Sequence, residues 1–287
     1  MVDQKRVLKL KIAAAQCRKN VFRMIKASGH GHVGGALSAI DVVTALYFDK
    51  MNIDPSNSKM EGRDRFLLSA GHKCLAQYAV MAERGFMDKN ILDTYGSFKA
   101  CIPGHPDMHK LPGVEANTGA LGHGMSIAAG MAMAARIGEN KFNVFAITGD
   151  GELPEGSNWE AAAAAAKFGL DNLTVFVDNN NLQISGRANE VMNMEDIQEK
   201  FESFGWATTA IDGNDMNQIV ETLDSLPLEK GKPNMVLLHT VKAKGLSIGE
   251  DRAEYHFWNA KAEEIDAAMR EMDCEIKQLE KELEELK

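Results

Sequence analysis

Apolar residues recur along this chain at two spacings, one typical of helices and one typical of strands. From Val7 to Ala27 they recur every three or four residues, which predicts a helix, and the pattern stops at the glycine-rich residues 28–35. Ser38, followed three residues later by Asp41, resembles a capping box and predicts that a second helix begins there. The segment between these helices is therefore a loop, and it contains two histidines.

Short apolar runs bounded by small or polar residues predict the strands. The first is residues 66–72, and the clearest unit is a strand at 144–148, a helix at 157–169 and a strand at 173–180. This βαβ unit is expected to be right-handed, with its strands parallel. A helix-rich stretch then leads to another apolar run at 234–241. The predicted fold is α/β, with a doubly wound, mostly parallel sheet flanked by helices.

The C-terminal residues have a heptad pattern. Their apolar side chains alternate in steps of four and three, at Ile265, Met269, Met272, Ile276, Leu279, Leu283 and Leu286. A helix with this pattern could pair with a partner chain or pack on its own domain, and the pattern leaves both open. The chain is therefore divided into a main domain, residues 1–258, and a charged C-terminal helix, residues 259–287.

The composition fits a globular protein and disfavours binding to polyanions. The chain has 287 residues, 45% of them hydrophobic, which is enough for a large core. Its 41 acidic and 32 basic residues give a net charge of −9, with no long run of Lys or Arg. We therefore expect neither nucleic acid nor a membrane as a partner.

Cysteine spacing and hydropathy indicate a cytoplasmic protein. The N-terminal residues 1–16 lack an apolar signal core, and no stretch reaches the roughly 18 apolar residues needed to cross a bilayer. The cysteines are scattered without a Cys-x-x-Cys spacing and are expected to be reduced thiols. They are Cys17, Cys74, Cys101 and Cys274.

Hard oxygen donors follow both strands of the βαβ unit. Asp150 comes directly after the first strand, and Asn179 and Asn180 follow the second, so parallel pairing brings all three to one sheet edge. Carboxylate, amide and carbonyl oxygens suit magnesium or calcium rather than zinc. Gly149 and Gly151 flank the aspartate and leave room for a diphosphate, which the N-terminus of the following helix would also favour. A Gly-Asp-Gly sequence alone is also typical of a tight turn.

The sequence that follows Gly-Asp-Gly extends the motif and indicates its function. The sequence GDGELPEGSNWEAAAAAAKFGLDNLTVFVDNNNLQISG resembles the thiamine diphosphate motif of transketolases, which starts at GDG and closes with an Asn about thirty residues later. The segments SGHGHVGGALSAIDVVTALYF, DRFLLSAGH, PGHPDMHKLPGVEANTGALGHG and VKAKGLS are similar to successive transketolase segments. The resemblance runs from about residue 8 to residue 258 and implies a thiamine-diphosphate-binding fold.

The resemblance also implies roles for single residues near the cofactor. Asp150, Asn180 and the carbonyl group of Leu182 would ligate Mg²⁺, with Ca²⁺ as an alternative. Glu155 and Glu160 match acidic residues that link two cofactor sites near a subunit interface, although acidic residues also favour helix starts. The other residues expected to contact the cofactor are His72, Gly119, Leu121, Gly149, Gly151, Ile184 and Lys244.

Three histidines match transketolase residues that contact the sugar or move protons. They are His32, His105 and His256, whereas His30 would support its loop and His109 and His239 are expected to be structural. Neutral imidazoles can shuttle protons near neutral pH. The chain departs from the family at two places: His123 replaces a usual Gln, and Phe257 followed by Trp258 replaces a small Gly. These departures put the choice of sugar in question.

The implied activity is transfer of a two-carbon ketol unit from a ketose phosphate to an aldose phosphate, as in the pentose phosphate pathway. The glutamate that activates the cofactor belongs to a second, pyrimidine-binding domain in this family, and the chain ends before such a domain begins. We therefore expect a split transketolase, inactive alone, that forms an α2β2 heterotetramer with separate pyrimidine-binding subunits.

Three alternatives remain from the sequence. The α subunit of a thiamine-dependent oxo-acid dehydrogenase would share the GDG-to-Asn motif, but would not be expected to have the SGH, SAGH and PGHP histidines. A transketolase-like subunit could act on a modified ketose, such as a sulfosugar or a branched sugar phosphate. A non-catalytic cofactor-binding or interaction subunit would explain the missing domain and the heptad pattern.

Overall fold

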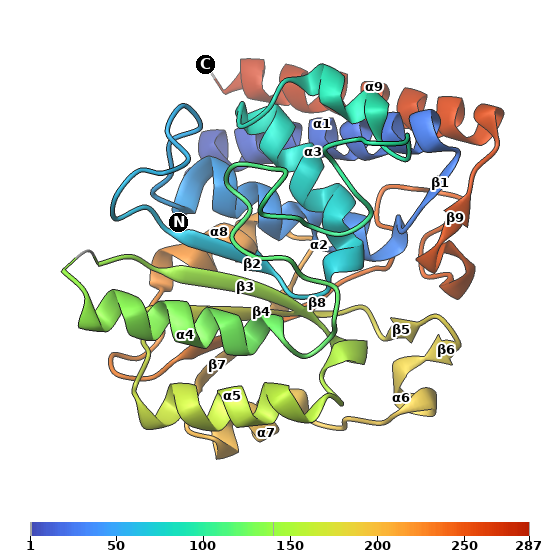
Figure 1. Cartoon of the computed structure of the whole chain (residues 1–287). Helices are drawn as coiled ribbons and strands as arrows, with labels where there is room; N and C mark the ends of the chain where they lie inside the picture. The colour runs from blue at the N-terminus through green and yellow to red at the C-terminus, as the bar shows by residue number, and fades with distance from the viewer. Residues whose placement is uncertain (1, 140, 287) are drawn as a thin grey trace.

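Five parallel strands form the central sheet of the protein, shown by a computed structural model that describes residues 2–139 and 141–286 (Figure 1). Across the sheet they are β2 (Arg65–Leu68), β3 (Val144–Gly149), β4 (Leu173–Asn179), β8 (Asn234–His239) and β7 (Ala207–Asp212). All residues of β3 are buried, as expected for a parallel strand that is covered on both faces. The predicted doubly wound α/β fold is confirmed.

Two helical layers cover the sheet (Figure 1). Alternate side chains of β3 belong to different core clusters, one beneath each layer. Phe145 and Ile147 of β3 belong to one core cluster, whereas Val144 and Ala146 belong to the other. The first layer consists of α1 (Gln4–Ser28), α2 (Gly34–Ala45), α3 (Cys74–Arg84), α8 (Met216–Ser225) and α9 (Ala262–Glu285). The second consists of α4 (Gly124–Ile137), α5 (Gly156–Lys167) and α7 (Ile197–Ser203).

Short elements lie mainly at the ends of the sheet. β1 (His30–Gly31) pairs antiparallel with β9 (Trp258–Asn259), which brings together segments more than 200 residues apart in sequence. The others are β5 (Leu182–Gln183), β6 (Gly186–Arg187), α6 (Ala188–Val191), a π-helical turn at Leu46–Lys50, and 3-10 turns at Gly71–Lys73, Lys89–Thr94, Asp150–Glu152 and Ala253–His256.

One local prediction was wrong. The capping box at Ser38 and Asp41 does not form, because α2 begins at Gly34 and Ser38 is buried within the helix. Its hydroxyl donates to the carbonyl of Gly35 at 3.0 Å and to the carboxylate of Asp178 at 2.6 Å. Asp178 lies on β4, 140 residues from Ser38 in sequence, so no local pattern could identify it as the partner. Asp41 instead pairs with Arg18 at 2.6 Å.

The stretch predicted to be rich in helix contains the strand β7. It lies at the edge of the sheet, so most of its residues are partly or fully exposed and it lacks the continuous apolar run of the inner strands. Its sequence, ATTAID, is rich in the small and β-branched residues that fit an edge strand. A search for apolar runs therefore misses it.

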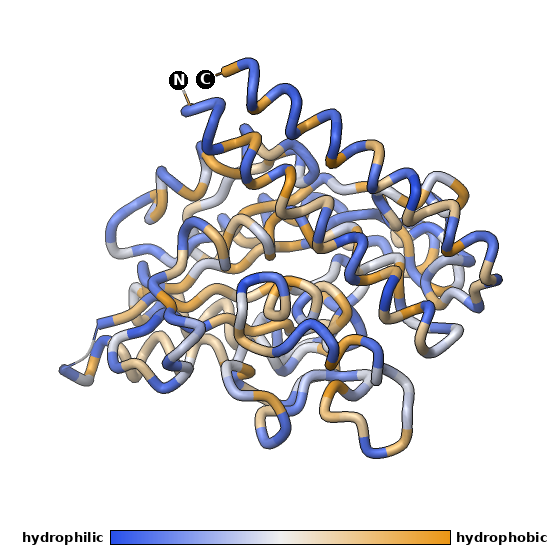
Figure 2. The backbone as a smooth tube through the Cα atoms, turned by 90° about the horizontal axis from the view of Figure 1, so that it is seen from above, coloured by the Kyte–Doolittle hydropathy of each residue, from blue (hydrophilic) through white to orange (hydrophobic). Residues whose placement is uncertain are grey.

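The C-terminal helix packs along the N-terminal helix of the same chain. α1 and α9 run side by side, and both termini lie at the same end of the molecule (Figure 2). Lys26 of α1 pairs with Asp266 of α9 at 2.7 Å. Three residues of α9 belong to the main core cluster: Ile265, Ala268 and Met272. The first half of the heptad pattern is thus used within this chain, while the domain boundary at residue 258 stays a prediction.

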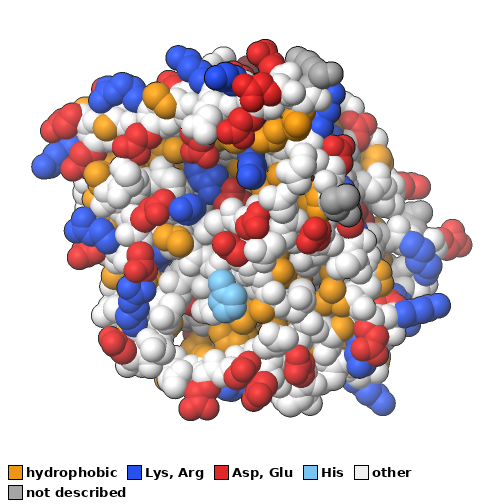
Figure 3. Space-filling model, turned by 180° about the vertical axis from the view of Figure 1, so that it is seen from behind, with side chains coloured by type: hydrophobic (Ala, Val, Ile, Leu, Met, Phe, Trp, Pro, Cys, Tyr) orange, Lys and Arg blue, Asp and Glu red, His pale blue; other side chains and the backbone are white. Residues whose placement is uncertain are grey.

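The surface mixes charges of both signs. On the face shown in Figure 3, basic and acidic side chains are interspersed. Elsewhere in the structure, exposed ion pairs include Arg187 with Asp251 at 2.7 Å. Such pairs contribute little to stability because water screens them. Within the described ranges, the structure has no helix long and apolar enough to span a bilayer.

Candidate active site

A cavity of about 220 Å³ lies at the carboxyl edge of the central sheet. The ends of β3 and β4 form one wall, and the turns that follow β2 and β8 form the others. Parallel sheets bind ligands at this edge because their functional loops gather there. Nine residues selected from the sequence line it: His72, Leu121, Gly149, Asp150, Gly151, Asn180, Leu182, Ile184 and His256.

Asp150 is held at the cavity floor by two backbone groups. Its carboxylate accepts a hydrogen bond from the N–H of Gly151 at 2.7 Å and another from the N–H of Asn181 at 2.6 Å. Burial, and secondarily the nearby charge of Asp178, raise the pKa of Asp150 to about 6. A bound cation would favour the ionised form of this carboxylate.

The loop after β4 provides the other predicted metal donors. The N–H of Leu182 donates to the side-chain oxygen of Asn180 at 3.1 Å, which fixes the loop between them. The carbonyl oxygen of Leu182 accepts from Nζ of Lys242 at 2.8 Å. Ile184, which is 75% exposed, projects at the cavity mouth.

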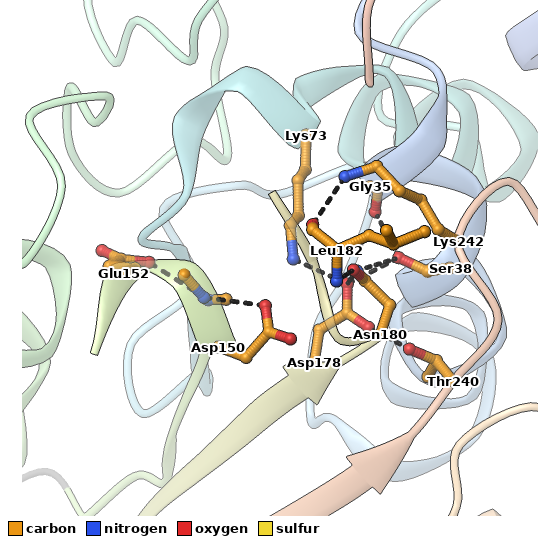
Figure 4. A network of polar contacts seen from close by, with 12 residues as sticks. Gly35, Ser38, Lys73, Asp150, Glu152, Asp178, Asn180, Leu182, Thr240 and Lys242 are labelled. Carbon is orange, nitrogen blue, oxygen red and sulfur yellow. Dashed lines mark hydrogen bonds and ion pairs between the residues drawn. The ribbon is translucent and has the colours of Figure 1, made fainter. Parts of the chain in front are cut away.

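Beside these donors lies a buried ion pair that the sequence analysis missed (Figure 4). Lys73 donates to the carboxylate of Asp178 at 2.6 Å, and both side chains are almost fully buried. Burial raises the pKa of Asp178, but Lys73 and hydrogen bonds from Ser38 and Thr240 more than offset this, so the pKa is below its usual value. Lys73 directly follows His72 in the sequence, and this was the available signal.

Lys242, not Lys244, reaches the cavity. Besides the carbonyl of Leu182, its Nζ lies 3.2 Å from Nδ1 of His256. Burial, and secondarily the charge of Lys73, lower the pKa of Lys242 to about 8. Lys244 is absent from the cavity lining, and its ammonium group pairs with Glu250 at 3.3 Å. The two lysines are two positions apart, so sequence alone could not distinguish which one points inward.

Glu152 is a second buried carboxylate that sequence reasoning missed. It accepts from the N–H of Gly122 at 2.8 Å, from the N–H of Gly149 at 3.2 Å and from the hydroxyl of Ser69. These bonds tie the segment at Gly122 to the ends of β2 and β3. Glu152 therefore organises the cavity wall from within.

Close backbone contacts shape the loop around Gly119. A Cβ atom at Gly119 would lie 2.6 Å from Cδ2 of His105, and one at Gly71 would lie 2.6 Å from the carbonyl carbon of Thr118. Gly119 also has φ +137°, a conformation that favours glycine. It therefore lies against His105 rather than in the cavity lining.

The glutamates predicted near an interface lie outside the cavity. Glu155 precedes α5 and packs against Gly122, while Glu160 is exposed on the helix surface. The first turn of α5 does not line the cavity either; the short turn Asp150–Glu152 stands between them. The N-terminus of α5 is therefore not placed to bind a diphosphate in this cavity, contrary to the prediction.

Four histidines from separate segments cluster beside the cavity, and two of them, His72 and His256, line it. The ring centre of His32 lies 5.5 Å from that of His72, 6.3 Å from that of His105 and 5.5 Å from that of His256. The centres of His72 and His256 are 5.2 Å apart. All three histidines predicted to be catalytic are thus brought together with His72.

Burial lowers the pKa of three of these imidazoles, those of His32, His72 and His256, and so favours their neutral form. Burial, and secondarily the charge of Lys73, lower the pKa of His72 to about 2. Burial, and secondarily Lys242, lower the pKa of His256 to about 3, and burial with His105 also lowers that of His32. A neutral imidazole has one nitrogen that donates and one that accepts, which suits proton transfer.

Of the two departures from the family pattern, only one lies at the histidine cluster. The ring of Phe257 stacks on His30 at 5.4 Å and meets His32 edge-on at 4.9 Å, and it is 41% exposed. Trp258 is buried in the β1–β9 ribbon. His123 is exposed, with Nδ1 3.1 Å from the carbonyl oxygen of Leu121. His239 ends β8 away from the cluster.

The cavity fits a diphosphate with a divalent cation. Asp150, Asn180 and the carbonyl of Leu182 offer three hard oxygens, and two buried lysines balance negative charge. Added side chains would crowd this cradle, because a Cβ at Gly151 would lie 3.0 Å from Gln183. In the parts of the chain that the structure describes, no group of three or more His, Cys, Asp or Glu side chains forms a metal site of another kind.

Comparison with solved structures shows the same fold. Transketolase from Campylobacter jejuni superposes with a TM-score of 0.82 at 27% identity, over 99% of this chain and 49% of that one. A mutant transketolase from Pichia stipitis gives 0.83 at 27% identity, over 96% and 46%. The chain therefore spans about half the length of these solved enzymes.

Relatives of similar length are named as transketolase subunits. One is a subunit of the apulose-4-phosphate transketolase of Phocaeicola vulgatus, 40% identical over 95% of this chain and 97% of its own length. Another, from the 6-deoxy-6-sulfo-D-fructose transketolase of Clostridium sp., is 40% identical over 90% and 94%. The family model "Transketolase, thiamine diphosphate binding domain" matches residues 10–280. The chain thus belongs to the transketolase family and comprises its thiamine diphosphate binding domain.

Proposed function

We propose that this chain is the diphosphate-binding subunit of a two-subunit transketolase, which moves a two-carbon ketol unit from a ketose to an aldose phosphate. One observation carries the proposal: a cavity lined by hard oxygen donors and two buried lysines borders a cluster of four histidines, two of which, His72 and His256, line it. The relatives of similar length, which are themselves named as subunits, support the need for a partner chain.

In this proposal Asp150, Asn180 and the carbonyl of Leu182 hold Mg²⁺. Leu182 would exchange its hydrogen bond from Lys242 for the cation, which frees that ammonium group for a diphosphate oxygen. Gly149 and Gly151 leave the approach open, and Ile184 and Leu121 offer apolar contact at the cavity lining. When bound, thiamine diphosphate supplies a carbon nucleophile and an electron sink for the two-carbon fragment.

The histidines would handle the sugar. His32, His105 and His256 lie close enough to one another to contact a carbonyl oxygen and neighbouring hydroxyl groups of one bound ketose. Because burial keeps His32 and His256 neutral, each can accept a proton from a hydroxyl group or donate one to an oxygen. We assign proton transfer to His32 and His256, and substrate orientation to His105.

The donor in this proposal is a modified ketose rather than a pentose phosphate pathway sugar. Two relatives are named for apulose-4-phosphate and for a sulfofructose, a branched sugar phosphate and a sulfosugar. In this chain, Phe257 fills space beside His30 and His32 where transketolases usually have a small Gly. The ring narrows the cluster on that side and gives it an apolar wall.

The partner is proposed to be a separate pyrimidine-binding subunit, in an assembly with two copies of each chain. An apolar groove of about 380 Å³ between α4 and α5 supports a contact with another chain on this face. Glu160 lines it, together with Gly130, Met133 and Phe168, and Phe168 is 54% exposed. The placement of Glu155 and Glu160 at the junction of two cofactor sites is part of this proposal.

Assembly can be tested at Gly130, where a new side chain would meet nothing within 4 Å in this chain. Gly130→Leu is expected to weaken the assembly without unfolding the chain, as measured by light scattering. Lys59→Leu, on an exposed turn outside the groove, is the control. Unchanged assembly of Gly130→Leu would exclude this groove from the interface.

The activity is tested by two-carbon transfer with thiamine diphosphate and Mg²⁺, using the chain alone and with the partner captured from its native extract. Xylulose 5-phosphate, apulose 4-phosphate and sulfofructose are compared as donors. Transfer only in the mixture, and only from a modified donor, is the expected result. Transfer by the chain alone would disprove the two-subunit proposal.

The role of Phe257 is tested by Phe257→Gly in the same assembly. We expect kcat/KM for the modified donor to fall about tenfold relative to that for xylulose 5-phosphate, since one lost apolar contact changes discrimination by about 1–3 kcal/mol. Trp258→Phe, in the buried ribbon, is the control and should leave this ratio unchanged. An unchanged ratio in Phe257→Gly would remove Phe257 from substrate choice.

A further inference from the structure

Two buried lysines pass beside consecutive glycines to reach the cavity. The exposed fractions of Lys73 and Lys242 are 3% and 2%. A Cβ atom at Gly35 would lie 2.9 Å from Cε of Lys73, and one at Gly34 would lie 3.0 Å from Cε of Lys242. The glycine pair at the start of α2 therefore leaves room for both lysine stems.

The two ammonium groups end on different partners (Figure 4). Lys242 donates to the carbonyl of Leu182 at 2.8 Å, and the proposed function places it beside the diphosphate. Lys73 donates to the carboxylate of Asp178 at 2.6 Å, and this carboxylate also contacts the side chain of Asn180, a proposed metal donor. The proposed function gives Lys73 no role, although a buried charged pair is costly to maintain.

Asp178 uses its carboxylate to hold neighbouring side chains. It accepts from the hydroxyl groups of Ser38, at 2.6 Å, and Thr240, and from the side-chain N–H of Asn180 at 3.3 Å. A carboxylate accepts hydrogen bonds and donates none when ionised, so Asn180 must turn its NH2 group toward it. The amide oxygen of Asn180 then faces the other way, toward the loop at Leu182.

We propose that Lys73 is a positioning residue for the metal site: it fixes Asp178, and Asp178 fixes which face of the Asn180 amide is presented to the cation. This inference rests on the proposed function, because it assumes that Asn180 is a metal ligand. Residues that orient metal ligands from behind affect affinity nearly as strongly as the ligands do.

The alternative is direct contact between Lys73 and the diphosphate, since Lys73 also lines the cavity. The two roles differ in their coupling to Asp178. If Lys73 acts through Asp178, removing both side-chain charges costs no more than removing one. If Lys73 binds the diphosphate directly, the two losses multiply.

The test measures Mn²⁺ affinity by paramagnetic resonance in the presence of thiamine diphosphate and the partner subunit, for wild type, Lys73→Met, Asp178→Asn and the double variant. Each single variant is expected to bind Mn²⁺ about 10–100-fold more weakly. The double variant should bind no more weakly than the weaker single variant. It also has no unpaired buried charge, so the test remains possible if Lys73→Met does not fold.

Two further variants sharpen the result. Gly35→Ala, which would push the Lys73 stem aside, should weaken Mn²⁺ binding in the same direction as Lys73→Met. Lys50→Met is the matched control, because the ammonium group of Lys50 caps the carbonyl of Leu223, at a residue outside the cavity lining. It should leave Mn²⁺ affinity unchanged.

The outcomes distinguish a failure of the cofactor site from a failure of the positioning role. If wild type does not bind Mn²⁺ with thiamine diphosphate, the proposed cofactor site fails and this inference fails with it. If wild type binds but Lys73→Met binds equally well, or the two single losses multiply, only the positioning role is overturned. A double variant that matches the weaker single variant supports it.

Discussion

The two ends of the cavity differ in how their polar side chains are stabilised. At one end, Lys73 and Lys242 face Asp150 and Asp178, so two positive and two negative groups are buried together. At the other, four imidazoles cluster, and in the ranges that the structure describes no carboxylate hydrogen-bonds to their rings. One end keeps its charges by pairing carboxylates with ammonium groups, whereas the other has imidazoles without a carboxylate partner, and Lys242 contacts it only at His256.

This difference indicates what each end can bind. Buried charges that balance one another can be rearranged around an incoming cation and polyanion with little change in net charge. Imidazoles without a counter-charge stay neutral when buried, because desolvation disfavours their protonated form. The first end therefore suits a metal diphosphate, and the second suits the uncharged carbonyl and hydroxyl groups of a sugar.

The largest effect is expected from removing a metal ligand at the charged end. Asp150→Asn removes the ionised metal ligand, so Mg²⁺-dependent binding of thiamine diphosphate should fall at least 100-fold and transfer activity should disappear. Calorimetry measures the binding. His105→Asn, at the other end, is the control and should keep the cofactor affinity. Retained Mg²⁺-dependent binding in Asp150→Asn would place the metal elsewhere.

The next largest effect is expected from removing an imidazole at the histidine end. His256→Asn is expected to lower kcat by about 10²–10⁴-fold, as typical for loss of a general acid or base. Cofactor affinity should change less than threefold, because the charged end keeps its ligands. Steady-state kinetics and calorimetry on the same preparation separate the two effects. Equal losses in kcat and in cofactor affinity would show that the two ends do not act independently.

A smaller effect sharpens the comparison through pH. The pKa of His72 is lowered to about 2 in the fold, while an unfolded histidine titrates near pH 6.5. Below pH 6.5 the unfolded chain takes up a proton that the folded chain refuses, so stability falls as pH falls. The free energy of unfolding should lose about 1–2 kcal/mol from this residue between pH 7.5 and pH 5.

Urea unfolding at the two pH values measures this change. His72→Asn should lose less stability over the same interval than wild type, by about the amount expected from one histidine. Asp150, whose pKa is raised, acts in the opposite direction and is unchanged in both proteins. An identical pH dependence in wild type and His72→Asn would mean that this ring is not held neutral.

The smallest expected effect lies outside the cavity. Lys26 and Asp266 pair between α1 and α9 with about half of each side chain exposed. Lys26→Met should change the free energy of unfolding by less than about 1 kcal/mol, because water screens such pairs. Thermal unfolding measures it. A loss as large as that in Lys73→Met would contradict the view that burial gives the cavity charges their importance.

Local sequence was sufficient for much of this protein. The inner strands β3 and β4 are continuous apolar runs, and parallel pairing then dictates that Asp150 and Asn180 meet at one edge. The histidines could be selected because they stand in glycine- and proline-rich loops, in segments that resemble one family. The spacing of apolar residues is a local property, so it can be inferred from the sequence without the fold.

Only the tertiary structure decided the partners of buried side chains. Lys73 meets Asp178, 105 positions later, and Ser38 points to the same carboxylate instead of capping a helix. Lys242 rather than Lys244 turns inward, and its stem lies against Gly34 at the start of α2. Desolvation and packing act between segments that the fold brings together, so no local pattern contains them. The sequence determined which chemical groups reach the sheet edge, and the fold determined how they are paired.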